Sequence, residues 1–260
     1  MEERQQKPNR DENVVAGRNA VAELLRSGRE IDSLYIQKGE LKGSVVSLVA
    51  KARQQGIPVK EADSRKLDFM CGGVNHQGIV AVAAAWSYAE LSDILEAAGE
   101  SPFLVVCDHL EDPHNLGAVI RTAEAAGAHG VIIPKRGGVG LTTAVAKASA
   151  GAVEHLPVAR VANIASTIKE LQKKGIWVYC ADMDGQPWCS TDFSGGVALV
   201  VGSEGQGVSR IVREACDATV ALPMLGQVNS LNASVAAGII LYEICRQRQG
   251  IAAHTPKKKG

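Results

Sequence analysis

The first third of the chain alternates between helical and strand-like spacings of its hydrophobic residues. Apolar positions recur every three to four residues over 17–28, 44–56 and 64–70, which predicts three helices, the first of them ending at Gly28. Segments 31–37, 57–62 and 78–84 carry the pattern of short strands. Together these elements predict a small α/β domain over residues 13–84.

Continuous apolar runs dominate after residue 102. They predict strands over 103–108, 130–134, 176–182, 197–202 and 218–223. Helical spacing alternates with these runs and predicts helices over 115–127, 141–151, 164–175, 208–216 and a closing helix after the NSLN stretch. Apolar strands separated by helices are typical of a mostly parallel sheet covered on both faces. We therefore expect a second α/β domain over 102–249.

The remaining segments are predicted to connect or flank these two domains. Residues 85–101 predict a linker that contains a helix and ends in a turn at Glu100, Ser101 and Pro102. Residues 1–12 mix charges of both signs and predict a flexible tail, and residues 250–260 form a basic tail.

Composition narrows the possible partners. Of the 260 residues 46% are hydrophobic and 22% charged, and the formal net charge is zero. A nucleic-acid surface would therefore have to be a local patch. Its candidate residues, each of which can equally be an ordinary solvated charge, are Arg18, Arg65, Lys66, Lys135 and Arg136.

Cysteine usage and hydropathy suggest a compartment. The six cysteines include no CxxC pair, and no signal peptide precedes the first domain, so we expect reduced thiols in a cytoplasmic protein. The apolar run Ala233–Cys245 is shorter than the ~18 residues that a membrane span needs. No membrane association is expected. The histidines and cysteines show no metal-ligand spacing, and no metal is expected.

Three loops follow predicted strands at the edge where parallel α/β sheets bind ligands. In the first, DHLEDPHNLGAVIRTAEAAG, Asn115 is expected to cap a helix that Gly117 allows to pack closely. Arg121 lies on a different face of that helix from the apolar residues. It can pair with Glu124 one turn on, or hold a phosphate with its fork of donors.

The second loop, VALVVGSEGQGVS, places glycines directly after a strand. Such glycines allow a ligand to approach the backbone, or they simply make a tight turn, and the turn alone does not explain Glu204 between Gly202 and Gly205. The spacing matches neither GxGxxG nor the P-loop, and it occurs late in the chain. A nicotinamide-dependent oxidoreductase is therefore disfavoured.

The third loop, LPMLGQVNSLNASVAAG, brings four polar side chains directly before an apolar helix. Asn229 or Ser230 is expected to cap this helix. Capping needs only one such residue, so the others predict the wall of a pocket.

The three segments, in this order, resemble the motifs of SpoU/TrmH-type ribose 2′-O-methyltransferases of the SPOUT superfamily. No motif position departs from the pattern. The resemblance extends through KASAGAVEHLPVARVANI, VVAGRNAVAELLRSG and NHQGIVAV, and covers the chain apart from its tails. Within the family, the sequence most resembles the bacterial enzymes that methylate a guanosine in the peptidyl-transferase region of large-subunit (23S) ribosomal RNA.

The resemblance implies a fold, a cofactor and partners. The second domain would contain a C-terminal trefoil knot, a rare exception to the rule that chains do not thread through themselves. The first would bind RNA. The protein would be a homodimer, with part of the closing helix buried between subunits. S-adenosylmethionine would contact Gly202, Leu222 and Leu231, and the polar site would consist of Asn115, Arg121, Glu204, Ser230 and Asn232.

Mechanistic roles follow from this resemblance and from side-chain chemistry. Arg121 is a poor base, because the pKa of arginine exceeds ~12, so we expect it to position a phosphate and stabilise the developing alkoxide. Full proton abstraction by Arg121 is the bolder alternative. Asn115 and Asn232 would orient the arginine or the substrate, and Glu204 would hold Arg121 or its own loop.

Two alternatives to ribosomal RNA methylation stay open. A transfer-RNA guanosine methyltransferase would share all three motifs, and only the first domain and the linker bear on the target. A non-catalytic RNA-binding protein would need no intact Arg121 or NSLN stretch. The amino-terminal domain favours ribosomal RNA.

Overall fold

A computed structural model describes residues 13–27, 29–39, 43–84, 87–227 and 230–253 of the chain. The chain divides into two compact units. Unit 1 comprises Met1–Ser87 with Gly140–Thr143, and unit 2 comprises Tyr88–Val139 and Ala144–Gly260. The predicted helix end at Gly28 and the predicted tail over 1–12 lie outside the described residues.

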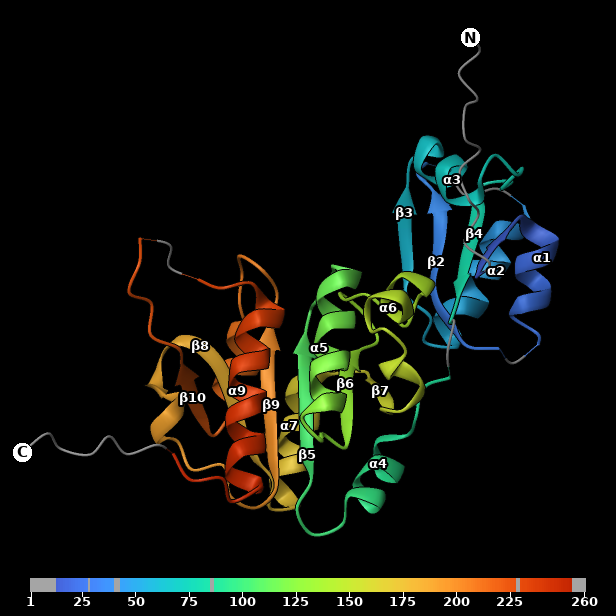
Figure 1. Ribbon diagram of the computed structural model, residues 1–260. Coiled ribbons are helices and arrows are strands. Elements are labelled where there is room, and N and C mark those ends of the chain that lie inside the picture. The colour runs from blue at the N-terminus through green and yellow to red at the C-terminus, as the bar shows by residue number, and fades with distance from the viewer. Residues whose placement is uncertain (1–12, 28, 40–42, 85–86, 228–229, 254–260) are drawn as a thin grey trace, which may run out of the picture. The chain divides into compact units, whose positions relative to one another are not determined.

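Unit 1 is a four-stranded sheet with three helices (Figure 1). Its elements are β1 (Val14–Ala16), α1 (Arg18–Leu24), β2 (Ile31–Gln37), α2 (Ser44–Gln54), β3 (Val59–Ala62), α3 (Ser64–Cys71) and β4 (Ile79–Ala83). The strand order is β1-β4-β2-β3, in which only β2 and β3 are parallel. Strand β1 was not predicted, because three residues are too few to show a period.

The two faces of this sheet are covered differently. Helices α1 and α2 pack on one face through Val21, Leu24, Leu48 and Val49. Helix α3 packs on the other face through the buried residue Leu67. Asp63 caps α3 by accepting a hydrogen bond from the Lys66 backbone amide at 2.8 Å.

Unit 2 is a six-stranded sheet in the order β10-β8-β9-β5-β6-β7, and every neighbouring pair is parallel. Its strands are β5 (Phe103–Asp108), β6 (Gly130–Pro134), β7 (Val158–Val161), β8 (Trp177–Pro187), β9 (Val197–Gly202) and β10 (Ala218–Ala221). Its helices are α4 (Leu91–Ala98), α5 (Pro113–Ala125), α6 (Thr143–Ala148), α7 (Ile164–Lys173), α8 (Arg210–Ala215) and α9 (Ala233–Arg248), with short 3-10 turns at Ala152–Glu154 and Trp188–Ser190.

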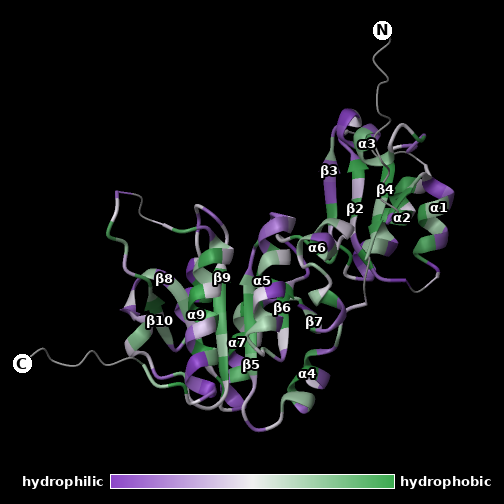
Figure 2. Ribbon diagram, in the orientation of Figure 1, coloured by the Kyte–Doolittle hydropathy of each residue, from purple (hydrophilic) through white to green (hydrophobic). Residues whose placement is uncertain are grey.

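Helices cover both faces of the unit 2 sheet, as its apolar strands require. Strands β5, β6 and β9 are hydrophobic along their length (Figure 2). Helices α7 and α8 pack on one face through Ile164, Ile168, Leu171 and Val212. Helices α5 and α9 contact one another and lie in front of the sheet in Figure 1, with Ile240 buried on α9.

The predicted fold class, an α/β fold with a mostly parallel sheet after a small α/β domain, is confirmed. Two strands differ from expectation: β7 was not predicted, and β8 continues past residue 182 to Pro187. The trefoil knot and the domain borders stay predictions. Helix α4 lies in the predicted linker, and its Ile94 is buried in the core of unit 2. None of the helices in the described segments has the length and hydropathy to cross a membrane.

Candidate functional site

A pocket of about 550 Å³ lies among the carboxyl-terminal parts of β8, β9 and β10 and the start of α9. Its lining includes all three residues expected to contact a cofactor, namely Gly202, Leu222 and Leu231. It also includes Glu204, Ser230 and Asn232 of the expected polar site. Two of the three motif segments therefore form one wall, although they are separate in sequence.

Gly202 ends β9 at the point where the following loop folds back on itself. The Ser203 amide donates to the Gly207 carbonyl at 3.1 Å, and the Gly207 amide donates to the Ser203 carbonyl at 2.9 Å. A Cβ on Gly202 would lie 2.0 Å from the Gly207 carbonyl carbon, so no side chain fits. The close approach that requires glycine here is to the loop's own backbone, which supports the tight turn, one of the two alternatives that the sequence left open.

The amide of Asn232 connects all three motif segments. Its Nδ2 donates to Asn115 Oδ1 at 2.9 Å and also to Glu204 Oε1. Its Oδ1 accepts hydrogen bonds from the backbone amides of Ser234 at 2.9 Å and Val235 at 3.2 Å. Both halves of this side chain are thus occupied, and its orientation is fixed.

The same hydrogen bonds make Asn232 the N-cap of α9, which corrects the prediction of Asn229 or Ser230. Asn229 lies outside the described residues, and Ser230 lines the pocket two residues before the helix begins. Asn232 has the extended backbone that N-caps adopt, with φ −54° and ψ 139°, so its side chain can reach the first free amides.

Helix α5 also begins earlier than predicted. Its N-cap is Asp112, whose carboxylate accepts from the His114 amide at 2.9 Å, and Pro113 occupies the first turn. Proline suits that position because its φ is already helical and its missing amide hydrogen needs no partner. Asn115 therefore lies inside the helix, where its side chain is buried and faces Asn232.

Gly117 allows α5 to approach α6 as closely as predicted. A Cβ at this position would lie 2.4 Å from the Ala148 Cβ and 2.8 Å from the Val145 carbonyl oxygen. The predicted apolar face of α5, with Leu116, Val119 and Ile120, is fully buried. The helix start that carries Asn115 is therefore held by packing on both sides.

Arg121 is exposed on α5 and does not line the pocket. Within the described parts of the chain it forms no hydrogen bond or ion pair, so neither the expected pairing with Glu124 nor one with Glu204 is present. Glu204 instead binds Asn232. The structure thus brings together every expected polar residue except Arg121.

One residue of the site was not singled out from sequence. Asp108 ends β5 beside Gly202 of β9, and its carboxylate is fully buried. It accepts from the Ser209 amide at 2.7 Å and contacts His109 Nδ1 at 2.5 Å. Asp108 thereby fixes the end of the glycine loop to the neighbouring strand. Its position at the carboxyl end of an apolar strand was the available signal.

The charged residues that line the pocket are acidic. Asp182 and Glu204 line it, and none of the described lining residues is Lys, Arg or His. Asp182 is held by Arg213 of α8 at 2.9 Å. Beneath the site, burial and the neighbouring Asp108 raise the pKa of the Cys107 thiol to about 12, so this cysteine stays protonated and unreactive.

Sequence comparisons agree with this geometry. The SpoU rRNA Methylase family matches residues 102–242, and a family described as RNA 2′-O ribose methyltransferase substrate binding matches residues 14–89. The chain is 49% identical over 241 residues to YacO of Bacillus subtilis, a protein assigned by name to the TrmH family of tRNA/rRNA methyltransferases. That alignment covers 91% of this chain and 96% of YacO. A Staphylococcus haemolyticus protein assigned to the same family is 44% identical over 92% of this chain and 97% of its own length.

Solved structures are similar over nearly the whole chain. The SpoU methyltransferase AviRb from Streptomyces viridochromogenes, in complex with AdoMet, has a TM-score of 0.59 and 27% identity, with 91% of this chain and 90% of AviRb covered. An AdoMet-bound rRNA methyltransferase from Sinorhizobium meliloti has a TM-score of 0.58 and 28% identity, with 92% and 88% covered. The Aquifex (A. aeolicus) TrmH/SpoU tRNA modifying enzyme has a TM-score of 0.53 and 30% identity over 58% of this chain and 79% of its own.

Proposed function

Because this chain belongs to the SpoU rRNA Methylase family, we propose that it methylates the ribose 2′-hydroxyl of a guanosine in the peptidyl-transferase region of large-subunit (23S) ribosomal RNA. The family uses S-adenosylmethionine. The observation that carries the proposal is the Asn232 amide, which connects Asn115 and Glu204 at the wall of the pocket.

The pocket fits the cofactor in size and in charge. Its volume of about 550 Å³ is within the range of ordinary small-molecule sites, about 300–1,000 Å³. Leu222, Leu231 and Ile240 offer apolar walls, and Glu204, which has no cationic partner within the described residues, offers negative charge to a sulfonium. When bound there, S-adenosylmethionine supplies an electrophilic methyl group.

The residues of the chain then have to hold the ribose hydroxyl in line and stabilise it as it loses its proton. Since Asn232 donates to Asn115 Oδ1, the Nδ2 of Asn115 points elsewhere and is available to donate to a substrate oxygen. Glu204 keeps Asn232 in this orientation. Ser230 adds a hydroxyl to the same wall.

Arg121 positions a phosphate of the target and stabilises the developing alkoxide. Its guanidinium is exposed and is bonded to no residue in the described ranges, so it can bind RNA without breaking an internal contact. Its pKa makes it a poor general base, so proton abstraction by Arg121 is the less favoured alternative. Arg121 lies outside the pocket wall, and RNA that crosses both subunits of a homodimer would reach it.

We propose that α9 forms the dimer interface. Val235, Ile239 and Tyr242 follow one another at helical spacing and expose 50%, 39% and 54% of their surface. An apolar stripe of this kind on a helix beside a polar site is typical of a subunit interface. The protein is proposed to work in the cytoplasm, where ribosomal RNA is available.

Ribosomal RNA is favoured over transfer RNA by the extent of structural similarity. The S. meliloti rRNA methyltransferase matches 92% of this chain, so the similarity includes unit 1. The A. aeolicus tRNA modifying enzyme and an enzyme whose structure concerns C/U34 methylation on tRNA each match only 58%. The match to the enzyme for ribosomal RNA therefore covers a larger share of this chain than the matches to the two enzymes for transfer RNA.

Competition between substrates tests the target. Large-subunit ribosomal RNA and transfer RNA, both from cells that lack the native enzyme, are incubated with the protein and labelled S-adenosylmethionine. We expect kcat/KM to favour ribosomal RNA by at least about 1,000-fold, comparable to the gap between specific and non-specific nucleic-acid binding. A preference for transfer RNA would contradict the target and support the tRNA enzyme of the same family. Cofactor binding without transfer to either RNA would favour a non-catalytic RNA-binding protein.

A further inference from the structure

The α3 side of unit 1 carries an unusual group of cations around an aromatic ring. Lys60 Nζ lies 5.6 Å and Lys66 Nζ 5.4 Å from the ring centre of Tyr35. Both distances are within cation–π range. Tyr35 and Lys60 are direct neighbours across β2 and β3, and Lys66 reaches the ring from the first turn of α3.

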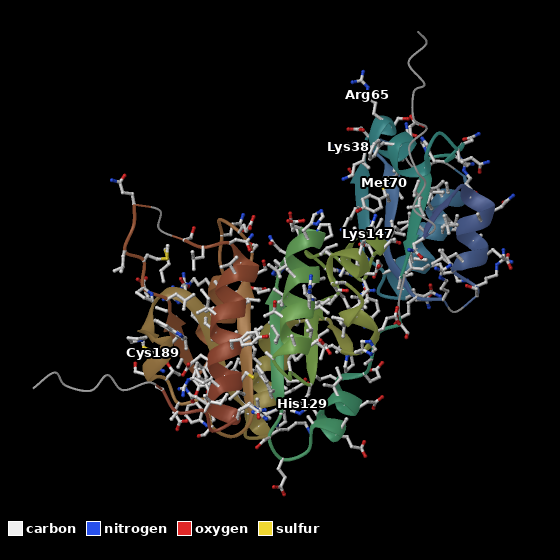
Figure 3. The ribbon with its side chains drawn as sticks, in the orientation of Figure 1. Lys38, Arg65, Met70, His129, Lys147 and Cys189 are labelled. Carbon is white, nitrogen blue, oxygen red and sulfur yellow. The ribbon has the colours of Figure 1, made fainter. Side chains whose placement is uncertain are left out.

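Two further cations extend this group. The Lys38 amide donates to the Ala62 carbonyl at 2.8 Å, which places Lys38 beside the end of β3 and the start of α3. Arg65 lies next to Lys66, and Figure 3 shows its side chain pointing away from the ribbon. Phe69, which is 76% exposed, follows Arg65 by four residues and so lies on the same side of α3. We call Lys38, Lys60, Arg65, Lys66 and Phe69 the α3 surface.

The charges of the α3 surface are not neutralised within the protein. Lys38, Lys60, Arg65 and Lys66 form no ion pair with any residue of the described segments. Of the nearby acids, Asp63 caps α3 and Asp68 contacts His76 at 3.4 Å. Glu61 alternates with Lys60 along β3, so its side chain lies on the opposite face of the sheet from that of Lys60. Two arginines of unit 1 do have partners, since Arg26 pairs with Glu23 and Arg29 donates to Asn13.

Helix stability does not account for these cations. Arg65 and Lys66 occupy the first turn of α3, where the positive end of the helix dipole repels them, and no acidic residue lies in that turn. Lys51 and Arg53 provide the contrast, because they occupy the last turn of α2, where the dipole favours cations. They also lie on the other face of the sheet. Arg65 and Lys66 are thus two adjacent cations at the end of their helix that is unfavourable for positive charge.

We propose that RNA crosses the α3 surface, with Lys38, Lys60, Arg65 and Lys66 neutralising backbone phosphates and Phe69 stacking on an unpaired base. This inference rests on the proposed function for the choice of RNA as the polyanion. Lysine and arginine contacts to phosphates carry no sequence information. The α3 surface would therefore supply affinity and position, while stacking on Phe69 requires a single-stranded segment.

Salt-dependent binding of the full-length protein tests the inference. The probe is a transcript of the peptidyl-transferase domain of 23S ribosomal RNA, and Kd is measured between 50 and 200 mM salt. In Lys60→Gln/Lys66→Gln we expect the slope of log K against log salt to fall by about two, one for each lost phosphate contact, and Kd to rise at least about tenfold. The matched control, Lys51→Gln/Arg53→Gln, removes the same charge from α2 and should keep the wild-type slope.

The Phe69→Ala variant provides an independent test of base stacking at the α3 surface. It should weaken binding of the transcript by roughly fivefold to 100-fold, the range for loss of one stacked base, and leave binding of a fully double-stranded RNA of equal length unchanged. Equal slopes for Lys60→Gln/Lys66→Gln and its control would overturn the inference, whether or not the enzyme transfers methyl groups. If the wild-type protein transfers no methyl group to any RNA, the proposed function fails, while the slopes still decide where RNA binds.

Discussion

A single amide, that of Asn232, performs two tasks that are usually divided between residues. Its oxygen caps α9, and its nitrogen holds Asn115 and Glu204 together. Because every hydrogen-bonding position of this side chain is used, both tasks depend on one orientation of the amide. The geometry of the site and the start of the helix are thus coupled through one residue.

Two substitutions of Asn232 separate these tasks. Asn232→Asp keeps an oxygen that can cap α9 but loses the donor and places a second carboxylate beside Glu204. We expect near wild-type thermal stability and a fall in kcat of about 100-fold, the size of effect that a small misplacement of reacting groups can have. Asn232→Ala should show the same fall and also lose about 1 kcal/mol of stability. Full activity of Asn232→Asp would mean that the contact to Glu204 does not serve catalysis.

Arg121 differs from Asn232, because its guanidinium has no partner within the described residues and its proposed role depends on bound substrate. We expect Arg121→Ala to lower the single-turnover rate by at least about 100-fold, as loss of a donor to a developing oxyanion does, while S-adenosylmethionine binding in calorimetry stays unchanged. Arg121→Lys should restore only part of the rate, since a lysine lacks the planar fork. Weakened cofactor binding in Arg121→Ala would instead make Arg121 a structural residue or a cofactor ligand.

The elements that carry the site are held by close packing at their glycines. A Cβ on Gly117 would collide with α6, whereas a Cβ on Gly238 would lie 3.5 Å from Thr122 Cγ2, an ordinary contact. Both glycines are in helices, where alanine is intrinsically better by about 1 kcal/mol. The structure therefore assigns different reasons to two glycines that look alike in sequence.

Alanine substitutions at these glycines should have opposite signs. Gly117→Ala is expected to destabilise the protein by about 1–3 kcal/mol through overpacking, and Gly238→Ala to be neutral or slightly stabilising. Chemical denaturation of both variants gives the comparison. Equal stabilities would show that α5 and α6 can move apart without penalty.

Hydrophobic periodicity predicted most helices and strands, but not the short ones or the caps. Strand β1 has three residues, too few for a pattern, and in β7 Arg160 interrupts a run of only four residues. Both cap assignments at the site were wrong, since Pro113 in one case and the dihedral angles of Asn232 in the other set where the helix starts. Asn115 and Asn232 are 117 residues apart, so only the family resemblance could place them together. Asp108 was overlooked although it ends an apolar strand, and the sheet register shows that it lies beside Gly202.

The start of β5 predicts a pH dependence of stability. The Phe103 amide donates to His129 Nδ1 at 2.9 Å, and burial together with nearby Arg248 lowers the pKa of His129, a residue labelled in Figure 3. The folded state thus favours the neutral ring. Its contribution to stability is complete above the unfolded-state pKa of about 6.5 and is lost as the pH falls through the lower folded-state pKa.

His129→Asn should remove this dependence, because its amide oxygen can still accept from Phe103 without titrating. Free energies of unfolding at pH 8, 6 and 5 would show it: we expect the wild-type protein to lose more stability than the variant between pH 6.5 and 5. Parallel curves for the two proteins would contradict the argument.

At the scale of the whole molecule, unit 1 has a cationic surface and unit 2 has a pocket lined by acidic residues. The formal net charge of the chain is zero. Because the cationic surface and the acidic pocket lie on different units, their opposite charges are not visible in the total. The composition therefore argued against a strong overall field but still allowed a local cationic surface. The proposed homodimer would supply two copies of each unit.

Dimerisation has its own test. We expect Ile239→Lys to convert a dimer into a monomer in analytical ultracentrifugation, because a charge would be buried in the interface. Ile211→Lys, on α8, is the matched control, since Ile211 is 72% exposed but lies away from the α9 stripe. A dimer that survives Ile239→Lys would place the interface elsewhere, and a wild-type monomer would remove it altogether.

Nucleoside analysis of the methylated RNA tests the central claim most directly. Large-subunit ribosomal RNA from cells lacking the native enzyme is incubated with the protein and labelled S-adenosylmethionine, digested to nucleosides and separated. The account predicts that the label appears in 2′-O-methylguanosine and that the adjacent phosphodiester resists alkali. Label in a base-methylated nucleoside, or no label although the cofactor binds, would contradict the assignment of this site to ribose methylation.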